Sequence, residues 1–141
     1  MRIAVVYTTR RGNTAKVAAA IAGALGVEAK RPAEMGDVGP LDLLLVGSGV
    51  YYGRTNEDLE RFLTGLPKGS VRCAAVFGTY GAHHLAAIQQ MKDLLFERGI
   101  PILDTFYCYG HFYFFRLRHP DARDLQRARE FALHVRARAE A

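Results

Sequence analysis

The stretch IAVVYTTRRGNT, residues 3–14, decides the fold of this chain. It begins with an apolar run, Ile3–Thr8, of the kind that is typical of a strand covered on both faces. A short loop rich in hydroxyl groups follows. From about Thr14 to Leu25 the apolar residues then recur at helical spacing, and Gly26 ends the pattern. This order predicts a strand, a tight loop and a helix, which together form the first unit of an alternating α/β chain.

The same alternation continues along the rest of the sequence. Apolar runs predict further strands at residues 27–30, 41–46, 71–77 and 100–107. Helical spacing predicts one helix after a Thr55 N-cap, one around Ile88 that ends at Gly99, and one with Pro120 in its first turn. Strict alternation predicts the α/β class, with a five-stranded parallel sheet between two layers of helices in a three-layer sandwich. We expect residues 1–141 to form a single domain.

Composition narrows the classes of protein to be considered. The formal net charge is +5 and the pI is near 9.5, which favours acidic partners or an anionic ligand. Two cysteines, Cys73 and Cys108, are too few for a disulfide framework, and no leader pattern precedes the first strand. No apolar run approaches the roughly 20 residues that span a bilayer. We therefore expect a cytoplasmic protein with free thiols.

Three segments rich in Gly, Ser, Thr and Tyr follow predicted strands, at residues 9–14, 47–53 and 78–81. In parallel sheets the carboxyl ends of the strands meet at one edge, which is where ligands bind. The first segment suits a phosphate, because a tight loop points backbone N–H groups and hydroxyls, including that of Thr8, at an anion at the start of a helix. It is neither a Walker loop nor the dinucleotide G-x-G-x-x-G. A phospho-receiver site is excluded because acidic residues are absent after the first strand.

The first segment also resembles the N-terminal signature of the flavodoxin family. The matching residues, without a gap, are Val5, Val6, Tyr7, Thr9, Gly12, Thr14, Ala18 and Ile21. GSGVYYG at 47–53 and GTYG at 78–81 resemble the two flavin-contacting loops of short flavodoxins. The resemblance covers nearly the whole chain and implies a flavodoxin-like fold with strand order 2-1-3-4-5. It also implies an electron-transfer protein or oxidoreductase that holds flavin mononucleotide (FMN).

The resemblance assigns the FMN phosphate to residues 9–14 and the flavin ring to the two later loops. Tyr51, Tyr52 and Tyr80 are the candidates to stack on the ring, although ordinary packing at strand ends would also account for them. The implied cofactor-binding residues are Thr9, Arg10, Arg11, Gly12, Asn13, Thr14, Ser48, Gly49, Val50, Tyr51, Tyr52, Gly53, Gly78, Thr79, Tyr80, Gly81 and His83. No catalytic residue and no metal ligand is predicted, and His119 has no paired ligand in the sequence.

The predicted rim of the site departs from the family in its charge. Ordinary flavodoxins are acidic, whereas this rim carries Arg10, Arg11, Arg54, His83 and His84. Positive charge stabilises a reduced flavin anion, and about 1.36 kcal/mol of such stabilisation raises a one-electron potential by about 59 mV. We expect a flavin that is less reducing than an ordinary flavodoxin's, and an acidic redox partner protein.

Two other interpretations of the function stay open. Thr-Arg-x-Gly-x-Thr at 9–14 and Val-x-Tyr-Gly at 50–53 also resemble the quinone-linked protoporphyrinogen dehydrogenases of the same superfamily, which donate to membrane quinones. Those enzymes carry a long insertion before the last strand, where this chain has a short turn around residues 98–100. The other interpretation is a non-redox module that binds a different anion. An electron carrier is favoured over a stand-alone enzyme; an enzyme would be an FMN-dependent oxidoreductase.

The stretch HFYFFRLRH, residues 111–119, is the most distinctive feature outside the three loops. Aromatic and basic residues together could dock an acidic redox partner or touch a membrane surface, or simply cover the sheet edge. No nucleic-acid module surrounds the stretch, so no nucleic-acid partner is expected. Cys108 ends the last predicted strand, where it either faces the flavin pocket or is an inert buried residue, as we expect Cys73 to be.

Overall fold

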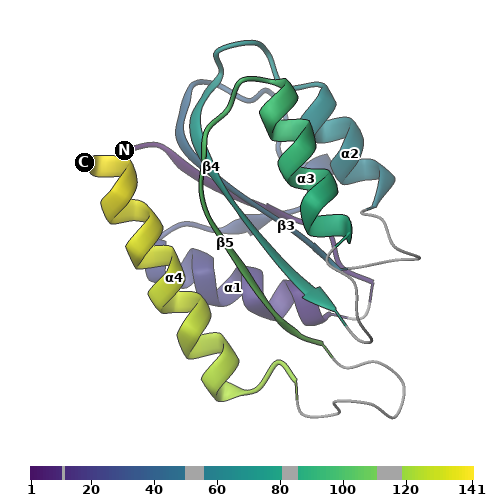
Figure 1. The fold of residues 1–141 in the computed structure, drawn as a ribbon, viewed down its shortest axis with the longest axis vertical. Helices are drawn as coiled ribbons and strands as arrows, with labels where there is room; N and C mark the ends of the chain where they lie inside the picture. Colours follow the sequence, from purple (N-terminus) through teal and green to yellow (C-terminus); the bar gives the residue numbers. More distant parts are fainter. Residues whose placement is uncertain (11, 50–55, 81–85, 111–118) are drawn as a thin grey trace.

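The computed structural model describes residues 1–10, 12–49, 56–80, 86–110 and 119–141 (Figure 1). In chain order its elements are β1 (Ile3–Tyr7), α1 (Asn13–Leu25), β2 (Ala29–Lys30), the 3₁₀ turn η1 (Pro32–Glu34), β3 (Leu41–Gly49), α2 (Glu57–Thr64), β4 (Val71–Tyr80), α3 (Ala86–Glu97), β5 (Ile102–Tyr109) and α4 (Ala122–Glu140). Strands and helices alternate as predicted.

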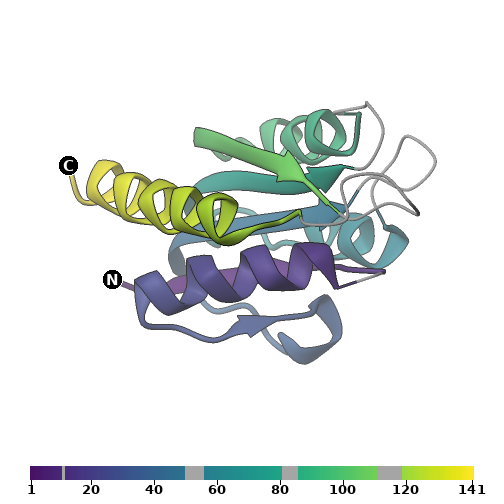
Figure 2. The same ribbon diagram turned by 90° about the horizontal axis from the view of Figure 1, so that it is seen from below.

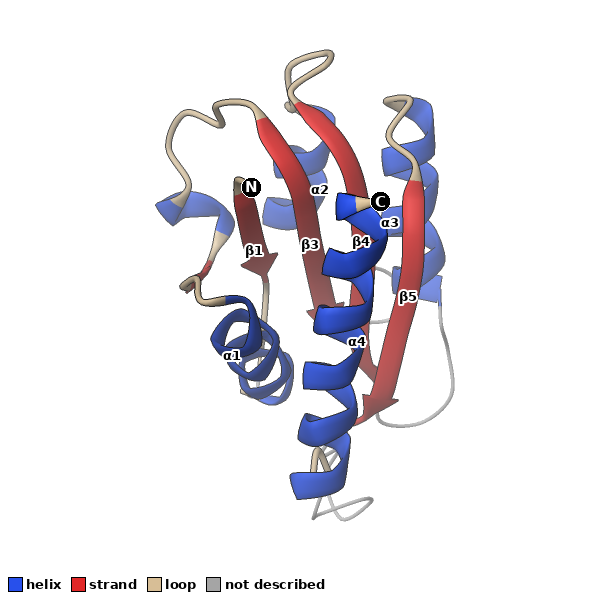
Figure 3. Ribbon diagram, turned by 90° about the vertical axis from the view of Figure 1, so that its left-hand side faces the viewer, coloured by secondary structure: helices blue, strands red, loops and turns tan. Residues whose placement is uncertain are grey.

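The five strands form one sheet in the order β2-β1-β3-β4-β5, and every neighbouring pair is parallel. The predicted order 2-1-3-4-5 is therefore confirmed. Helices α1 and α4 cover one face of the sheet, and α2 and α3 cover the other (Figures 2 and 3). All carboxyl strand ends point to the same edge, as the arrows in Figure 3 show.

The core consists of two apolar layers that share the sheet. Along β3, Leu43 and Leu45 face α1 and α4, whereas Leu44 and Val46 face α2 and α3. All four side chains have no exposed surface. Because both faces are covered, the central strands are continuously apolar, which made them visible in the sequence. Of the helices among the described residues, none has both the length and the apolar character that crossing a membrane would need.

Several element boundaries differ from the prediction for local chemical reasons. The strand expected at 27–30 is shortened to Ala29–Lys30, because the Val27 N–H bonds to Ala22 O and completes the cap of α1. Strand β5 begins at Ile102 because Pro101 has no N–H for the ladder; the Pro101 carbonyl instead accepts from Ala74. Strands β3, β4 and β5 run on past their predicted ends, since paired neighbours continue the ladder.

Two predicted helix starts are also wrong by one or two residues. The N-cap of α2 is Asn56, whose Oδ1 accepts from the Asp58 N–H at 2.7 Å; the predicted cap, Thr55, lies outside the described residues. Pro120 does not enter α4, because Asp121 caps that helix and Pro120 precedes it after a cis peptide bond.

Candidate cofactor site

The carboxyl edge of the sheet brings together the described parts of all three segments that the sequence singled out. In register, Tyr7 lies opposite Gly47 on β3, Ser48 opposite Gly78 on β4, and Gly49 opposite Thr79. The loop from β1 to α1 and the ends of β3 and β4 are therefore neighbours in space. Predicted site residues placed at this edge are Thr9, Arg10, Gly12, Asn13, Thr14, Ser48, Gly49, Gly78, Thr79 and Tyr80.

The other predicted residues lie outside the described part of the chain. These are Arg11, Val50, Tyr51, Tyr52, Gly53, Gly81 and His83, together with Arg54, His84 and most of the 111–119 stretch. Their assignment to a flavin site stays a prediction. Arg10 is described and exposed.

Gly12 makes the start of α1 available to an anion. It stands at the N-cap position with φ 88°, a left-handed conformation that glycine adopts without strain. Within the described chain, no side chain caps the helix, and its first turn contains no acidic residue. Because the first helical bond runs from Lys16 N–H to Gly12 O, the N–H groups of Thr14 and Ala15 have no acceptor inside the helix. Such a terminus favours a phosphate or carboxylate.

Two buried hydroxyl contacts join the loops across the sheet edge. Thr14 Oγ1 lies 2.8 Å from Thr79 Oγ1, so the first turn of α1 is bonded to the end of β4. Thr8 donates to Ser48 at 3.3 Å, and Ser48 donates to Gly49 O at 2.7 Å. We expected the Thr8 hydroxyl to donate its proton to the anion, but this proton is used in the hydrogen bond to Ser48. A pair of hydroxyls has two protons and the Thr14–Thr79 bond uses one, so one donor of that pair remains for a ligand.

Thr9 shapes the loop from within. Its Oγ1 accepts a hydrogen bond from the Gly12 N–H at 2.9 Å, which closes the loop into a tight turn. The Thr9 hydroxyl proton is not used in that bond and can still be donated outward. Thr9 therefore holds the turn, and its role as a hydroxyl donor to a ligand stays a prediction.

Glycine at two further positions allows the close approach of neighbouring segments. A Cβ on Gly78 would lie 2.9 Å from the Ile88 side chain, and one on Gly110 would lie 2.8 Å from Asn13 Nδ2. Gly110 follows β5 and so brings the end of that strand against the loop that precedes α1. Sequence analysis did not single out Gly110, because a lone glycine after a strand does not reveal what it packs against.

A cluster of tyrosines lies beside this edge. The Tyr80 ring is 4.8 Å from the Tyr109 ring and 5.9 Å from the Tyr107 ring, measured between centroids. Tyr80 is thus held by aromatic neighbours from β5, which the sequence did not predict. Its stacking on a flavin stays a prediction.

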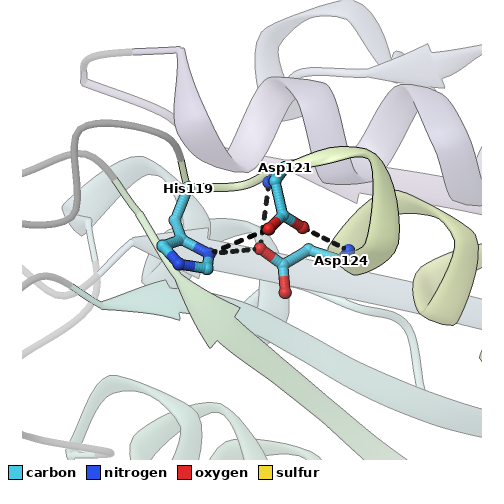
Figure 4. A network of polar contacts seen from close by, with 3 residues as sticks. All are labelled: His119, Asp121 and Asp124. Atoms are coloured by element: carbon cyan, nitrogen blue, oxygen red, sulfur yellow. Dashed lines mark hydrogen bonds and ion pairs between the residues drawn. The ribbon is translucent and has the colours of Figure 1, made fainter.

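His119 takes part in a polar cluster that sequence analysis missed (Figure 4). His119 Nδ1 lies 2.6 Å from Asp124 Oδ2, a carboxylate partner that the search for metal-ligand spacing did not reveal. The Asp124 carboxylate also accepts from the Asp121 N–H, and Asp121 accepts from the Asp124 N–H, which forms a capping box at the start of α4. These backbone hydrogen bonds, together with the nearby imidazole, keep the pKa of Asp121 below its usual value.

The three ligand atoms of this cluster lie within 4.8 Å of one another, a spacing that could hold a metal ion. Each carboxylate already serves the helix cap, which explains the arrangement without a metal. The Asp-x-x-Asp spacing at 121–124 was the available sequence signal.

We expect D124A to lower the free energy of unfolding by about 1–3 kcal/mol, because it removes charged hydrogen bonds to His119 and to the Asp121 N–H. Urea unfolding at neutral pH measures the change. E130A is the matched control, since Glu130 is an exposed acid of the same helix and contacts only Gln126 among the described residues. Equal losses in the two variants would mean that the cluster contributes nothing specific to stability.

Neither cysteine is available for redox chemistry. Cys108 packs in the core layer beneath α1 and α4. Burial, with a smaller contribution from the charge of Asp124, raises the pKa of the Cys108 thiol to about 12. The pKa of Cys73 is raised mainly by burial as well. Both thiols are free and protonated near neutral pH, so the inert interpretation is the one that the structure supports.

In a C73S variant, Cys108 is the remaining thiol, and we expect it to react with a thiol reagent at pH 8 roughly a thousandfold more slowly in the folded protein than in the unfolded protein. The reason is that the reactive thiolate is about a thousandfold rarer when the pKa is about 12 rather than 9. The same shift makes folding pH-dependent, since the folded state keeps a proton that the unfolded state has lost. The stabilisation is complete below pH 9 and declines as the pH rises toward about 12. Fast labelling of the folded protein would contradict this assignment.

Comparison with known proteins places the chain in a family. The family described as "Flavodoxin domain" matches residues 4–100. The chain belongs to this flavodoxin family. An uncharacterized protein of Methanocaldococcus jannaschii is 28% identical over 148 residues, covering 96% of this chain and 98% of the relative.

Solved flavodoxins share the fold of this family member over its whole length. A flavodoxin from the domain Archaea superposes with a TM-score of 0.79 at 20% identity and full coverage of both chains. Flavodoxin 2 from Bacillus cereus gives 0.76 at 20% identity, with 98% of this chain and 99% of that one covered. Two-electron-reduced Megasphaera elsdenii flavodoxin gives 0.70 at 23% identity, with 99% of each covered. At these identities the likeness establishes the fold.

Proposed function

We propose that this flavodoxin-family chain binds FMN and serves as an electron carrier. The observation that carries the proposal is the uncapped, acid-free start of α1 behind Gly12, with the buried Thr14–Thr79 hydroxyl pair beside it. This arrangement supplies backbone and hydroxyl donors where the family holds a phosphate. When bound, FMN would supply one- and two-electron redox chemistry. The chain's residues would bind the phosphate and position the ring at the sheet edge.

The length of the connection from α3 to β5 favours a carrier over a quinone-linked dehydrogenase. Helix α3 ends at Glu97 and β5 begins at Ile102, so only residues 98–101 connect them. The long insertion that the dehydrogenase resemblance requires is not present there. Two free, buried cysteines suit a reducing compartment such as the cytoplasm.

The test is to compare FMN with riboflavin, which lacks the phosphate. We expect a yellow purified protein, and apoprotein that binds FMN far more tightly than riboflavin, measured by quenching of flavin fluorescence. A colourless protein that binds neither flavin would leave the non-redox module as the function. Equal affinity for the two flavins would show that the start of α1 does not hold the phosphate. A redox titration of the loaded protein then tests our proposal that the basic rim makes the flavin less reducing than in ordinary flavodoxins.

A further inference from the structure

Helix α4 carries much of the positive charge of the molecule. Its five arginines are Arg123, Arg127, Arg129, Arg136 and Arg138. Arg136 lies 4.0 Å from Glu140. Within the described part of the chain, the other four arginines have no carboxylate within ion-pair distance. This helix therefore presents positive charge that the protein does not neutralise itself.

Helix stability does not explain why an arginine occurs at position 123. Arg123 stands in the first turn of α4, at the positive end of the helix dipole. A cation there is unfavourable, because it is repelled by the positive end of the dipole. The capping box of Asp121 and Asp124 already satisfies this end of the helix. A residue that opposes local stability without a structural compensation is a candidate for a functional role.

The charges lie along the edge of the sheet. The Arg127 guanidinium is 5.7 Å from the centre of the Phe106 ring of β5, and Arg138 donates to Leu103 O of the same strand. His134, between them on the helix, lies 3.8 Å from Asp104. Strand β5 is an edge strand, with β4 as its sheet neighbour. Arg123 lies one turn before Arg127, in the first turn of α4. Figure 1 shows that this helix begins near the carboxyl end of β5.

An aromatic side chain stands on the opposite side of β5. Phe106 and Cys108 point into the core beneath α4, so Tyr107 points to the other face of the sheet. Tyr107 is 43% exposed, which is unusual for a large aromatic residue within a strand. Its ring contacts Tyr80, the last residue of β4, beside the candidate cofactor site. Arg123 and Arg127 on α4 and Tyr107 on the other face therefore flank the edge strand β5 from its two sides, and we call these three residues the β5-edge patch.

We propose that the β5-edge patch is the docking surface for an acidic redox partner protein; this rests on the proposed function. The patch adjoins the edge where the cofactor is expected, so a partner bound there would lie near the flavin. Arginine and tyrosine are the residues enriched in the centres of protein interfaces. Asp104 lies 3.8 Å from His134, and Glu130 follows Arg127 by three residues on α4, so acidic groups are interspersed with the basic ones. This mixed pattern suits the discrete carboxylates of a protein better than the uniform charge of a nucleic acid.

The experiment uses a small acidic [2Fe–2S] ferredoxin as the probe and the FMN-loaded protein. The patch variant is R123E/R127E, and K68E/R98E is the control, since Lys68 and Arg98 are exposed at the opposite end of the sheet and give the same change in charge. At low ionic strength, where the Debye length is about 30 Å, we expect the association rate to fall at least tenfold in the patch variant and less than threefold in the control. In 1 M salt the difference should vanish. Y107S should raise the dissociation rate.

Each outcome of this experiment either supports or contradicts the proposed docking surface. Equal losses in the two double variants would show a general charge effect and overturn it. A selective loss of binding to single-stranded RNA or to anionic phospholipid vesicles, with ferredoxin binding unchanged, would assign the patch to another class of partner and also overturn it. Flavin content is measured on the same samples. A protein without FMN would refute the proposed function, whereas ferredoxin binding to that sample still tests the patch itself.

Discussion

We expect G47A to lower the free energy of unfolding by about 1–3 kcal/mol, because the added methyl group would clash with the ring of Phe77. A Cβ built on Gly47 would lie 2.0 Å from Phe77 Cε2, far closer than atoms can approach. Phe77 is fully buried and belongs to the layer under α1 and α4, so its ring has no free space to enter. Urea unfolding measures the loss. Since Gly47 stands opposite Tyr7, the distortion also reaches the candidate cofactor site.

Two further variants test whether the clash with Phe77 causes the loss of stability in G47A. We expect the same substitution to be less damaging in an F77L background, with a coupling free energy of about 0.5–3 kcal/mol in a double-mutant cycle. G23A is the control, because Gly23 lies within α1 with nothing within 4 Å of its added Cβ. That substitution should stabilise the protein by about 0.4–1 kcal/mol. If G47A is tolerated as well as G23A, contact with Phe77 does not explain why glycine occurs at position 47.

The Gly47–Phe77 contact illustrates what the sequence could not reveal. Apolar runs and helical spacing predicted the five strands and most of the core, because a sheet buried on both faces needs continuous apolar strands. The order of the strands followed from the resemblance to flavodoxins. The contact between Gly47 and Phe77 depends on strand register, with Gly47 directly opposite Phe77 in the ladder. Register between β3 and β4 joins residues that are 30 apart in the chain. No local pattern encodes it.

For the candidate site, too, the sequence predicted the polar residues but not the contacts that they make. The hydroxyls of the first loop were predicted from its composition, but their assignments were not. Thr8 bonds to Ser48 rather than facing a ligand, and Thr14 bonds to Thr79 across 65 positions of sequence. The contact of His119 with Asp124 was not predicted, because the turn into α4 brings the two side chains together. In each case the side chain was identified correctly as polar, and its partner was fixed by the fold.

T14V should weaken FMN binding about 10- to 100-fold, since a hydrogen bond to a charged group contributes about 1.5–3 kcal/mol. Valine keeps the shape of threonine and removes the hydroxyl, so the buried Thr14 site stays filled. Riboflavin has no phosphate, so its affinity should not change between the wild type and T14V. Fluorescence titration of both flavins separates the loss of a phosphate contact from a general distortion of the site.

T79V distinguishes the two roles of the hydroxyl pair. Either hydroxyl can be the donor in the 2.8 Å contact. If Thr79 donates to Thr14, the Thr14 proton is free to point at the ligand. In that case T79V should cause part of the loss of FMN affinity seen in T14V, because the Thr14 hydroxyl is no longer held in that orientation. T64V is the control, because Thr64 is an exposed threonine on α2 whose hydroxyl donates to Arg61 O. Full FMN affinity in T14V would show that the Thr14 hydroxyl makes no contact with the phosphate, because the substitution leaves the backbone N–H groups at the start of α1 in place.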